Sequence, residues 1–212
     1  MSIIELNAVT KVIRKQTVLE DINLSLAKGK IIGFVGHNGS GKTMLFRVIA
    51  GLVKPSAGEV IVSDQILHKQ ISFPKSISVL LEKPAFLEQY SGFDNLKFLA
   101  DIQKRIDDQQ IRQVIDSVGL NPDDKRSVKT YSLGMKQKLA IAQAIMEKPD
   151  IILLDEPMNG LDEDAVENVY HLIRAENERG ATVLLTSHHK QDIEKLCDVV
   201  YKMNSGKIET TD

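Results

Sequence analysis

The stretch GHNGSGKT, residues 36–43, follows directly after the apolar run IIGFV at residues 31–35. It fits the pattern G-x-x-x-x-G-K-[ST], with Gly36, Gly41, Lys42 and Thr43 at the fixed positions. Small residues let successive backbone N–H groups point at an anion, and a following helix adds the positive end of its dipole. We therefore expect a phosphate-binding loop between a strand at 31–35 and a helix at 43–52.

Each residue of this loop has a physical reason to contact a nucleotide. Lys42 can reach the β- and γ-phosphates, and the hydroxyl of Thr43 can ligate Mg²⁺. A flexible turn that contains these residues by chance would not explain the flanking strand and helix. The candidate nucleotide-binding residues are Gly36, His37, Asn38, Gly39, Ser40, Gly41, Lys42, Thr43 and Met44.

Two later apolar runs end in the polar residues that hydrolysis would need. In IILLDEP, residues 151–157, Asp155 ends the run and Glu156 follows it. Parallel sheets present their ligands at this end of the strands, so we expect Asp155 to hold Mg²⁺ and Glu156 to act as general base or orient water. In TVLLTSHH, residues 182–189, we expect His188 to hold the γ-phosphate and the water, and His189 to be solvated. The alternative is that the acids simply end a strand at the surface and that the histidine is structural.

The remaining pattern predicts an α/β fold with a mostly parallel sheet. The segments 3–9 and 18–26 alternate with period two and predict half-buried strands. Between about residues 84 and 146 the sequence becomes helical, with amphipathic stretches at 93–103, 109–120 and 132–147 and Ser132 as a plausible N-cap. This helical part resembles an insertion between two halves of the core.

Composition limits the kinds of function. The 212 residues carry a formal net charge of -2, which argues against a polybasic surface for nucleic acid. The single cysteine, Cys197, forms no internal disulfide, fits a reducing compartment, and is expected to be a small apolar residue on a helix. No apolar run approaches the ~20 residues that cross a bilayer, and no secretory signal is evident, so we expect any membrane role to come through a partner.

Four motifs stand in order along the chain: GHNGSGKT at 36–43, YSLGMKQ at 131–137, IILLDEP at 151–157, and NGLD at 159–162 followed by TSHH at 186–189. Together they resemble the nucleotide-binding subunit of ATP-binding cassette (ABC) transporters over nearly the whole chain. The resemblance implies a P-loop NTPase (RecA-like) core, an N-terminal antiparallel β subdomain and an inserted α-helical subdomain. It implies one domain over 1–212, with the core at 1–83 and 149–212 and the helical subdomain at 84–148, and ATP and Mg²⁺ as ligands.

The family's signature motif, LSGGQ, corresponds to residues 131–135. Ser132 and Gly134 are retained and imply contacts with the γ-phosphate bound by a second subunit, whereas Leu133 and Met135 depart from the pattern. The SLGM version resembles the bacitracin and lantibiotic peptide exporter subfamily. At the position of the family's Q-loop glutamine stands Glu82, which can also ligate Mg²⁺.

The family usually stacks adenine on an aromatic residue, and the corresponding position here is Ile13. Stacking is worth ~1–3 kcal/mol per base. We therefore expect only a shallow preference for ATP over GTP.

The resemblance implies an ATP-hydrolysing subunit that powers transport. It favours export, of an antimicrobial peptide or drug. It also implies an ATP-dependent head-to-tail homodimer and a separate membrane permease, which would hold the chain at the cytoplasmic face of the cell membrane. Among four aromatic residues near the expected docking region, we expect Phe93 and Phe98 in the core and Phe86 and Tyr90 at the permease.

Two other functions remain open. A soluble ABC ATPase acting on nucleic acid or ribosomes is disfavoured by the single cassette and the charge of -2, so no direct nucleic acid binding is expected. A nucleotide-binding regulator without hydrolysis is disfavoured by Glu156 and His188.

Overall fold

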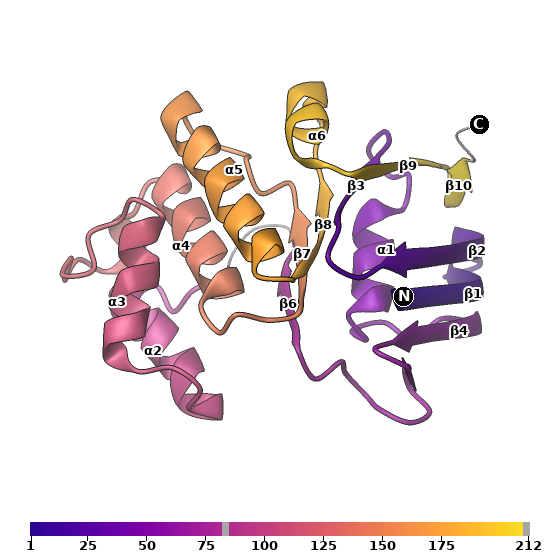
Figure 1. Cartoon of the computed structure of the whole chain (residues 1–212), viewed down its shortest axis with the longest axis horizontal. Helices are drawn as coiled ribbons and strands as arrows, with labels where there is room; N and C mark the ends of the chain where they lie inside the picture. The colour runs from indigo at the N-terminus through magenta and orange to yellow at the C-terminus, as the bar shows by residue number, and fades with distance from the viewer. Residues whose placement is uncertain (82–84, 210–212) are drawn as a thin grey trace.

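The computed structural model describes residues 1–81 and 85–209 and contains two β-sheets with helices on both sides of the larger one (Figure 1). The larger sheet has six strands in the order β10-β9-β3-β8-β7-β6, and β10 alone runs antiparallel to its neighbour. Its strands are β3 (Ile31–Val35), β6 (Ile77–Leu80), β7 (Ile151–Asp155), β8 (Thr182–Thr186), β9 (Val199–Asn204) and β10 (Lys207–Glu209). The predicted α/β class with a mostly parallel sheet is confirmed.

The central strands are continuous apolar runs because both faces of this sheet are covered. Every residue of β7 and β8 is buried, as expected for a parallel strand packed on two sides. Since β3, β8 and β7 are neighbours and run in the same direction, their carboxyl ends meet at one edge. The loop after β3 and the polar residues after β7 and β8 are thereby brought together.

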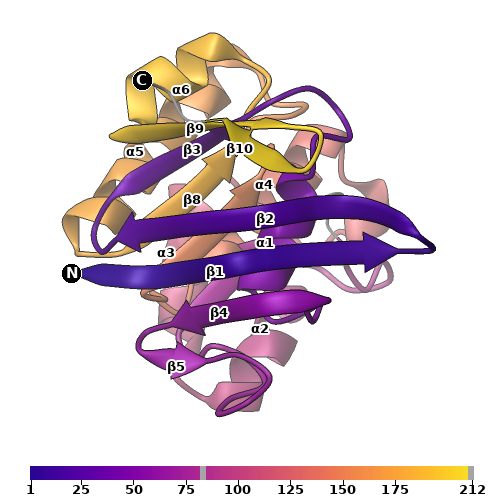
Figure 2. The same cartoon turned by 90° about the vertical axis from the view of Figure 1, so that its right-hand side faces the viewer.

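The smaller sheet is antiparallel, with the order β2-β1-β4-β5. Helix α1 (Lys42–Ile49) is packed between this sheet and the larger one (Figure 2), and its buried residues join one apolar core with strands from both. The predicted N-terminal antiparallel subdomain is therefore present. Its strands are β1 (Ser2–Ile13), β2 (Gln16–Ala27), β4 (Ala57–Val62) and β5 (Gln65–Ile66).

The remaining helices lie on the opposite face of the larger sheet, around a second apolar core. Helix α2 begins with a capping box between Ser91 and Asp94, and α4 begins at the expected cap, Ser132. The elements here are α2 (Gly92–Gln103), α3 (Asp108–Ser117), the short η1 (Val128–Thr130), α4 (Leu133–Ile145), α5 (Glu163–Glu178) and α6 (Lys190–Leu196). The predicted inserted helical subdomain is confirmed, and its boundaries at residues 84 and 148 stay a prediction.

One of the core assignments is wrong. Phe93 packs on the second core and carries the guanidinium of Arg112 over its ring, 4.9 Å from the ring centre. Phe98, however, is 42% exposed and meets the exposed Tyr90 edge to face at 4.9 Å. Five residues along a helix turn a side chain by about 140°, so the two phenylalanines face different sides. Phe86, expected at the permease, is partly buried against the core.

No helix within residues 1–81 and 85–209 combines the length and the apolar composition needed to cross a bilayer.

Candidate functional site

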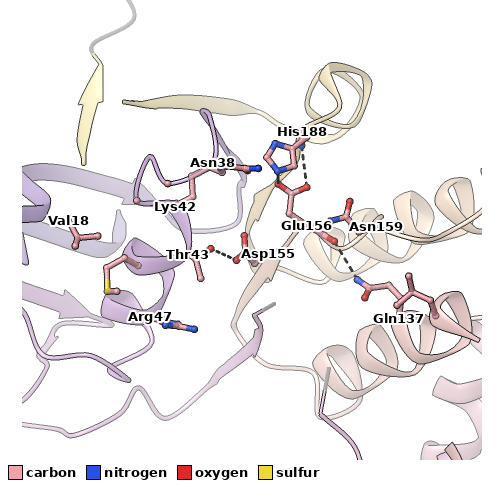
Figure 3. Close-up of a pocket in the computed structure, with 14 residues that line it drawn as sticks. Val18, Asn38, Lys42, Thr43, Arg47, Gln137, Asp155, Glu156, Asn159 and His188 are labelled. Atoms are coloured by element: carbon pink, nitrogen blue, oxygen red, sulfur yellow. Dashed lines mark hydrogen bonds and ion pairs between the residues drawn. The ribbon is translucent and has the colours of Figure 1, made fainter. Parts of the chain in front are cut away.

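A cavity of about 860 Å³ opens beside the loop after β3, at the carboxyl edge of the larger sheet (Figure 3). Its size is typical of sites for small molecules and cofactors. The residues that line it come from the loop, from β2, from α1 and α4, from the end of β7, and from the segments that follow β7 and β8. They are Val18, Asn38, Gly39, Gly41, Lys42, Thr43, Met44, Arg47, Leu133, Gln137, Asp155, Glu156, Asn159 and His188.

The loop curls tightly around the end of the Lys42 side chain. The Nζ of Lys42 donates to the carbonyl oxygens of Gly36, at 2.8 Å, and of His37, at 3.1 Å. A Cβ atom at Gly36 would lie only 2.3 Å from the carbonyl oxygen of Met203, so no side chain fits there. The Oγ of Ser40 is buried without a hydrogen-bond partner among the described residues. The buried hydroxyl of Ser40 and the buried ammonium of Lys42, together with the backbone N–H groups of the loop, suit a phosphate group.

The predicted loop residues do not all face the cavity. Asn38, Gly39, Gly41, Lys42, Thr43 and Met44 line it, whereas Gly36, His37 and Ser40 do not. The ring of His37 lies instead between the backbone oxygen of Asn38, at 2.8 Å from Nδ1, and the side-chain oxygen of Asn204, at 3.2 Å from Nε2.

Asp155 is held by two hydroxyl groups. Thr43 Oγ1 donates to its Oδ2 and Thr186 Oγ1 donates to its Oδ1, both at 2.6 Å. Thr186 also accepts a hydrogen bond from the backbone N–H of Glu156 at 3.0 Å, so one hydroxyl orients both acidic residues. The sequence analysis did not assign a role to Thr186; its place at the end of the apolar run 182–186 was the available signal, whereas its pairing with Asp155 is seen only in the structure.

The Thr43 hydroxyl and the Asp155 carboxylate form a set of hard oxygen donors that fits Mg²⁺. No group of three or more His, Cys, Asp or Glu residues within the described chain could hold a metal by itself. Mg²⁺ is usually held by one or two carboxylates together with substrate phosphates and water. Glu82, the third predicted ligand, lies outside the described residues.

Glu156 and His188 form a pair above Asp155. The backbone N–H of His188 donates to Glu156 Oε2 at 3.2 Å, and the ring Nε2 of His188 lies 3.0 Å from Glu156 Oε1 (Figure 3). Burial raises the pKa of Glu156, and the neighbouring His188 opposes this shift. The backbone of Glu156 is left-handed, with φ of 53°, which is strained for a residue with a side chain and is a feature that concentrates at functional sites. A half-buried carboxylate of this kind suits proton transfer.

Other lining residues were missed by the sequence analysis. Gln137 Nε2 donates to the carbonyl oxygen of Pro157 at 2.8 Å, and this bond joins α4 to the turn after β7. Arg47 lines the cavity one helical turn beyond Thr43, and Asn159 lines it from the NGLD segment. Only Gln137 and Asn159 lay within motifs that the sequence analysis singled out.

Of the signature residues 131–135, only Leu133 lines the cavity of its own chain. Ser132 and Gly134 do not line it, and the Ser132 hydroxyl caps α4 by accepting from the N–H of Met135 at 3.2 Å. Leu133 does line it and is 63% exposed. Ile13, the position expected to contact adenine, is 38% exposed and does not line the cavity, whereas Val18 does. None of the described residues that line the cavity is Phe, Tyr or Trp.

The chain is similar to known proteins in sequence and in fold. The family described as ABC transporter matches residues 19–159. The ABC transporter ATP-binding protein YybJ of Bacillus subtilis (strain 168) is 49% identical over 209 residues, which cover 99% of this chain and 96% of that protein. The bacitracin transport ATP-binding protein BcrA of Enterococcus faecalis is 33% identical over 208 residues, which cover 97% of this chain and 68% of that protein.

A solved structure of an ATP-binding subunit of an ABC transporter has the same fold. It superposes with a TM-score of 0.90 at 23% sequence identity, covering 99% of this chain and 89% of the other.

Proposed function

This chain belongs to the ABC transporter family and is an ABC ATPase, and from that premise we propose that it hydrolyses ATP to drive export through a separate membrane permease. The observation that carries the proposal is the carboxylate of Asp155, which contacts Thr43 of the phosphate loop while the pair of Glu156 and His188 stands beside it. The relation to BcrA supports a peptide antibiotic as the exported molecule. The permease would hold the chain at the cytoplasmic face of the membrane.

The phosphate groups would be bound by the loop and by Lys42. The ammonium of Lys42 can exchange the carbonyl oxygens of Gly36 and His37 for β- and γ-phosphate oxygens. The loop amides and the N-terminus of α1 would neutralise the remaining charge, so positioning and electrostatics supply most of the acceleration.

Mg²⁺ would be held by Thr43 and Asp155, with Glu82 as a further predicted ligand. When bound, Mg²⁺ neutralises charge on the β- and γ-phosphate oxygens. Thr186 keeps the Asp155 carboxylate oriented toward Thr43 through its own hydrogen bond.

Glu156 would accept the proton of the attacking water. Its raised pKa brings the carboxylate closer to the proton affinity that this step needs. His188, at 3.0 Å from Glu156, would orient the water and contact the γ-phosphate.

A second copy of the chain would complete each site. Ser132 and Gly134 lie outside the cavity of their own chain, and the exposed Leu133 marks the surface beside them. A head-to-tail dimer would bring Ser132 and Gly134 to the γ-phosphate of the partner. The rate of hydrolysis should then rise more steeply than linearly with protein concentration, and strict proportionality at high dilution would contradict the dimer.

The permease would dock on an exposed apolar patch around α2. The "α2 patch" consists of Leu87, Tyr90, Phe98, Leu99 and Ile102, and their exposed fractions range from 37% to 75%. Tyr90 and Phe98, two of its residues, contact each other edge to face. Replacing both residues by serine should abolish co-purification with the permease and leave ATP affinity unchanged; retained co-purification would contradict this surface.

The hydrolytic function is tested by Glu156→Gln, with Lys42→Ala as a second variant. Glu156→Gln should keep ATP affinity and lose at least a hundredfold in turnover, because the amide cannot accept the proton. Lys42→Ala should weaken ATP binding as well. Unchanged turnover in Glu156→Gln would overturn the general-base assignment, and unchanged affinity and turnover in Lys42→Ala would overturn the site.

A further inference from the structure

A buried carboxylate outside the cavity joins three elements of the fold. Asp192, on α6, is 4% exposed and accepts a hydrogen bond at each carboxylate oxygen. Tyr170, on α5, donates to Oδ1 at 2.5 Å, and Ser187, which follows β8, donates to Oδ2 at 2.5 Å. Tyr170 and Ser187 are buried to a similar degree. We call these three residues the Asp192 clamp.

The clamp fixes the backbone on either side of His188. The Ser187 hydroxyl donates to Asp192 and also accepts from the N–H of His189 at 3.0 Å. Between these two residues, the N–H of His188 donates to Glu156 Oε2. The Ser187 hydroxyl therefore ties the residues on both sides of His188 to Asp192.

The clamp also connects this segment to α5, which begins directly after the NGLD segment. Asp162 caps α5 by accepting from the N–H of Ala165 at 2.9 Å. A second cavity, of about 680 Å³, is lined by residues 158–161 together with Tyr170 and Asp192. The Nζ of Lys195 lies over the Tyr170 ring, 5.1 Å from the ring centre. The bond from Tyr170 to Asp192 thus connects α6 to α5, the helix that follows NGLD.

We propose that Asp192, Ser187 and Tyr170 are positioning residues that hold His188 against Glu156 and thereby set the rate of ATP hydrolysis. None of the three lines the nucleotide cavity. They should therefore act on turnover through His188 and leave nucleotide affinity unchanged. This inference rests on the proposed function.

The test compares Ser187→Ala and Tyr170→Phe in the full-length chain. Ser187→Ala should lower kcat at least tenfold with KM and ADP affinity within twofold, and Tyr170→Phe should lower kcat about threefold. Thr182→Val is the matched control, because Thr182 is fully buried at the other end of β8 and its hydroxyl accepts from the N–H of Gly29 at 2.9 Å. The control should lower the Tm and keep kcat within twofold.

A double variant separates positioning from general damage. Because the clamp acts through His188, adding Ser187→Ala to His188→Ala should cause no further loss of kcat. A full additional loss in the double variant, or a kcat within twofold of wild type in Ser187→Ala, would overturn the inference. If Ser187→Ala does not fold, kcat is compared in the same way for Tyr170→Phe, alone and combined with His188→Ala. The expected loss of kcat in Tyr170→Phe alone is about threefold.

The failure of the proposed function has a different signature. A wild-type chain that does not hydrolyse ATP, or a His188→Ala variant with wild-type turnover, would overturn both proposals. An active wild type that needs His188 but tolerates Ser187→Ala would overturn the clamp alone.

Discussion

Replacing Thr186 with valine removes one hydroxyl that orients both acidic residues of the site. The side chain keeps nearly the same shape, so no cavity is created, but Asp155 loses a hydrogen bond of 2.6 Å and the N–H of Glu156 loses its acceptor at 3.0 Å. A hydrogen bond to a charged group contributes about 1.5–3 kcal/mol, and an unsatisfied buried donor costs about 1–3 kcal/mol. Thr186 is fully buried, so water cannot replace the lost partner. We expect Thr186→Val to lower the free energy of unfolding by about 3 kcal/mol.

The assay is urea unfolding followed by circular dichroism, together with turnover as a function of Mg²⁺ concentration. Thr186→Ser is the control, since it keeps the hydroxyl and loses a methyl group worth about 1 kcal/mol. The m-value should stay constant, so that the shift in midpoint reports stability alone. Half-saturation by Mg²⁺ should require more metal in Thr186→Val than in Thr186→Ser. Equal stability of Thr186→Val and wild type, or equal damage by the two substitutions, would refute the role assigned to this hydroxyl.

Four further outcomes follow from the packing and the site. Gly33→Ala should destabilise the fold by about 1–3 kcal/mol, because its Cβ would lie 2.7 Å from Cys197 Sγ, and Cys197→Ala should restore part of this loss in chemical denaturation. Burial raises the pKa of the Cys197 thiol to about 12, so alkylation should be far slower in the native protein than in guanidinium chloride, and the stability that comes from the protonated thiol should fall as the pH rises above 9.0. Ser91→Ala should cost about 1 kcal/mol in thermal unfolding, because it removes the capping box of α2; no change would contradict the cap. The KM values for ATP and GTP should differ by less than about a hundredfold, since stacking on an aromatic residue, worth ~1–3 kcal/mol per base, is not available among the described lining residues.

The sequence was most informative where one local pattern determines structure. The runs that became β3, β7 and β8 are continuously apolar and of strand length, and their ends were predicted to within one residue. Lys42 and Thr43 were found because the loop pattern requires them at fixed spacing. Ser132 was found as a cap because its side chain acts within the next turn.

Features that depend on register or on distant partners could not be predicted. Thr186 meets Asp155 because β7 and β8 pair in parallel with these residues opposite each other, and the sequence does not give this register. Gln137 reaches the carbonyl oxygen of Pro157 across 20 residues. Strand β6 was missed because three of its four residues are only partly buried at the edge of the sheet and it carries little pattern of its own.

The larger sheet separates two apolar cores, and this division bears on how the protein could change over time. Helix α1, with the phosphate loop at its start, packs in one core with the antiparallel sheet, while α2 and α3 pack in the other. On the proposed docking of a permease at the α2 patch, substitutions that adapt α2 and α3 to a new partner would therefore leave the surroundings of α1 as they are. The proposed arrangement thus allows the same ATP-consuming machinery to be paired with different partners by altering one compartment of the molecule.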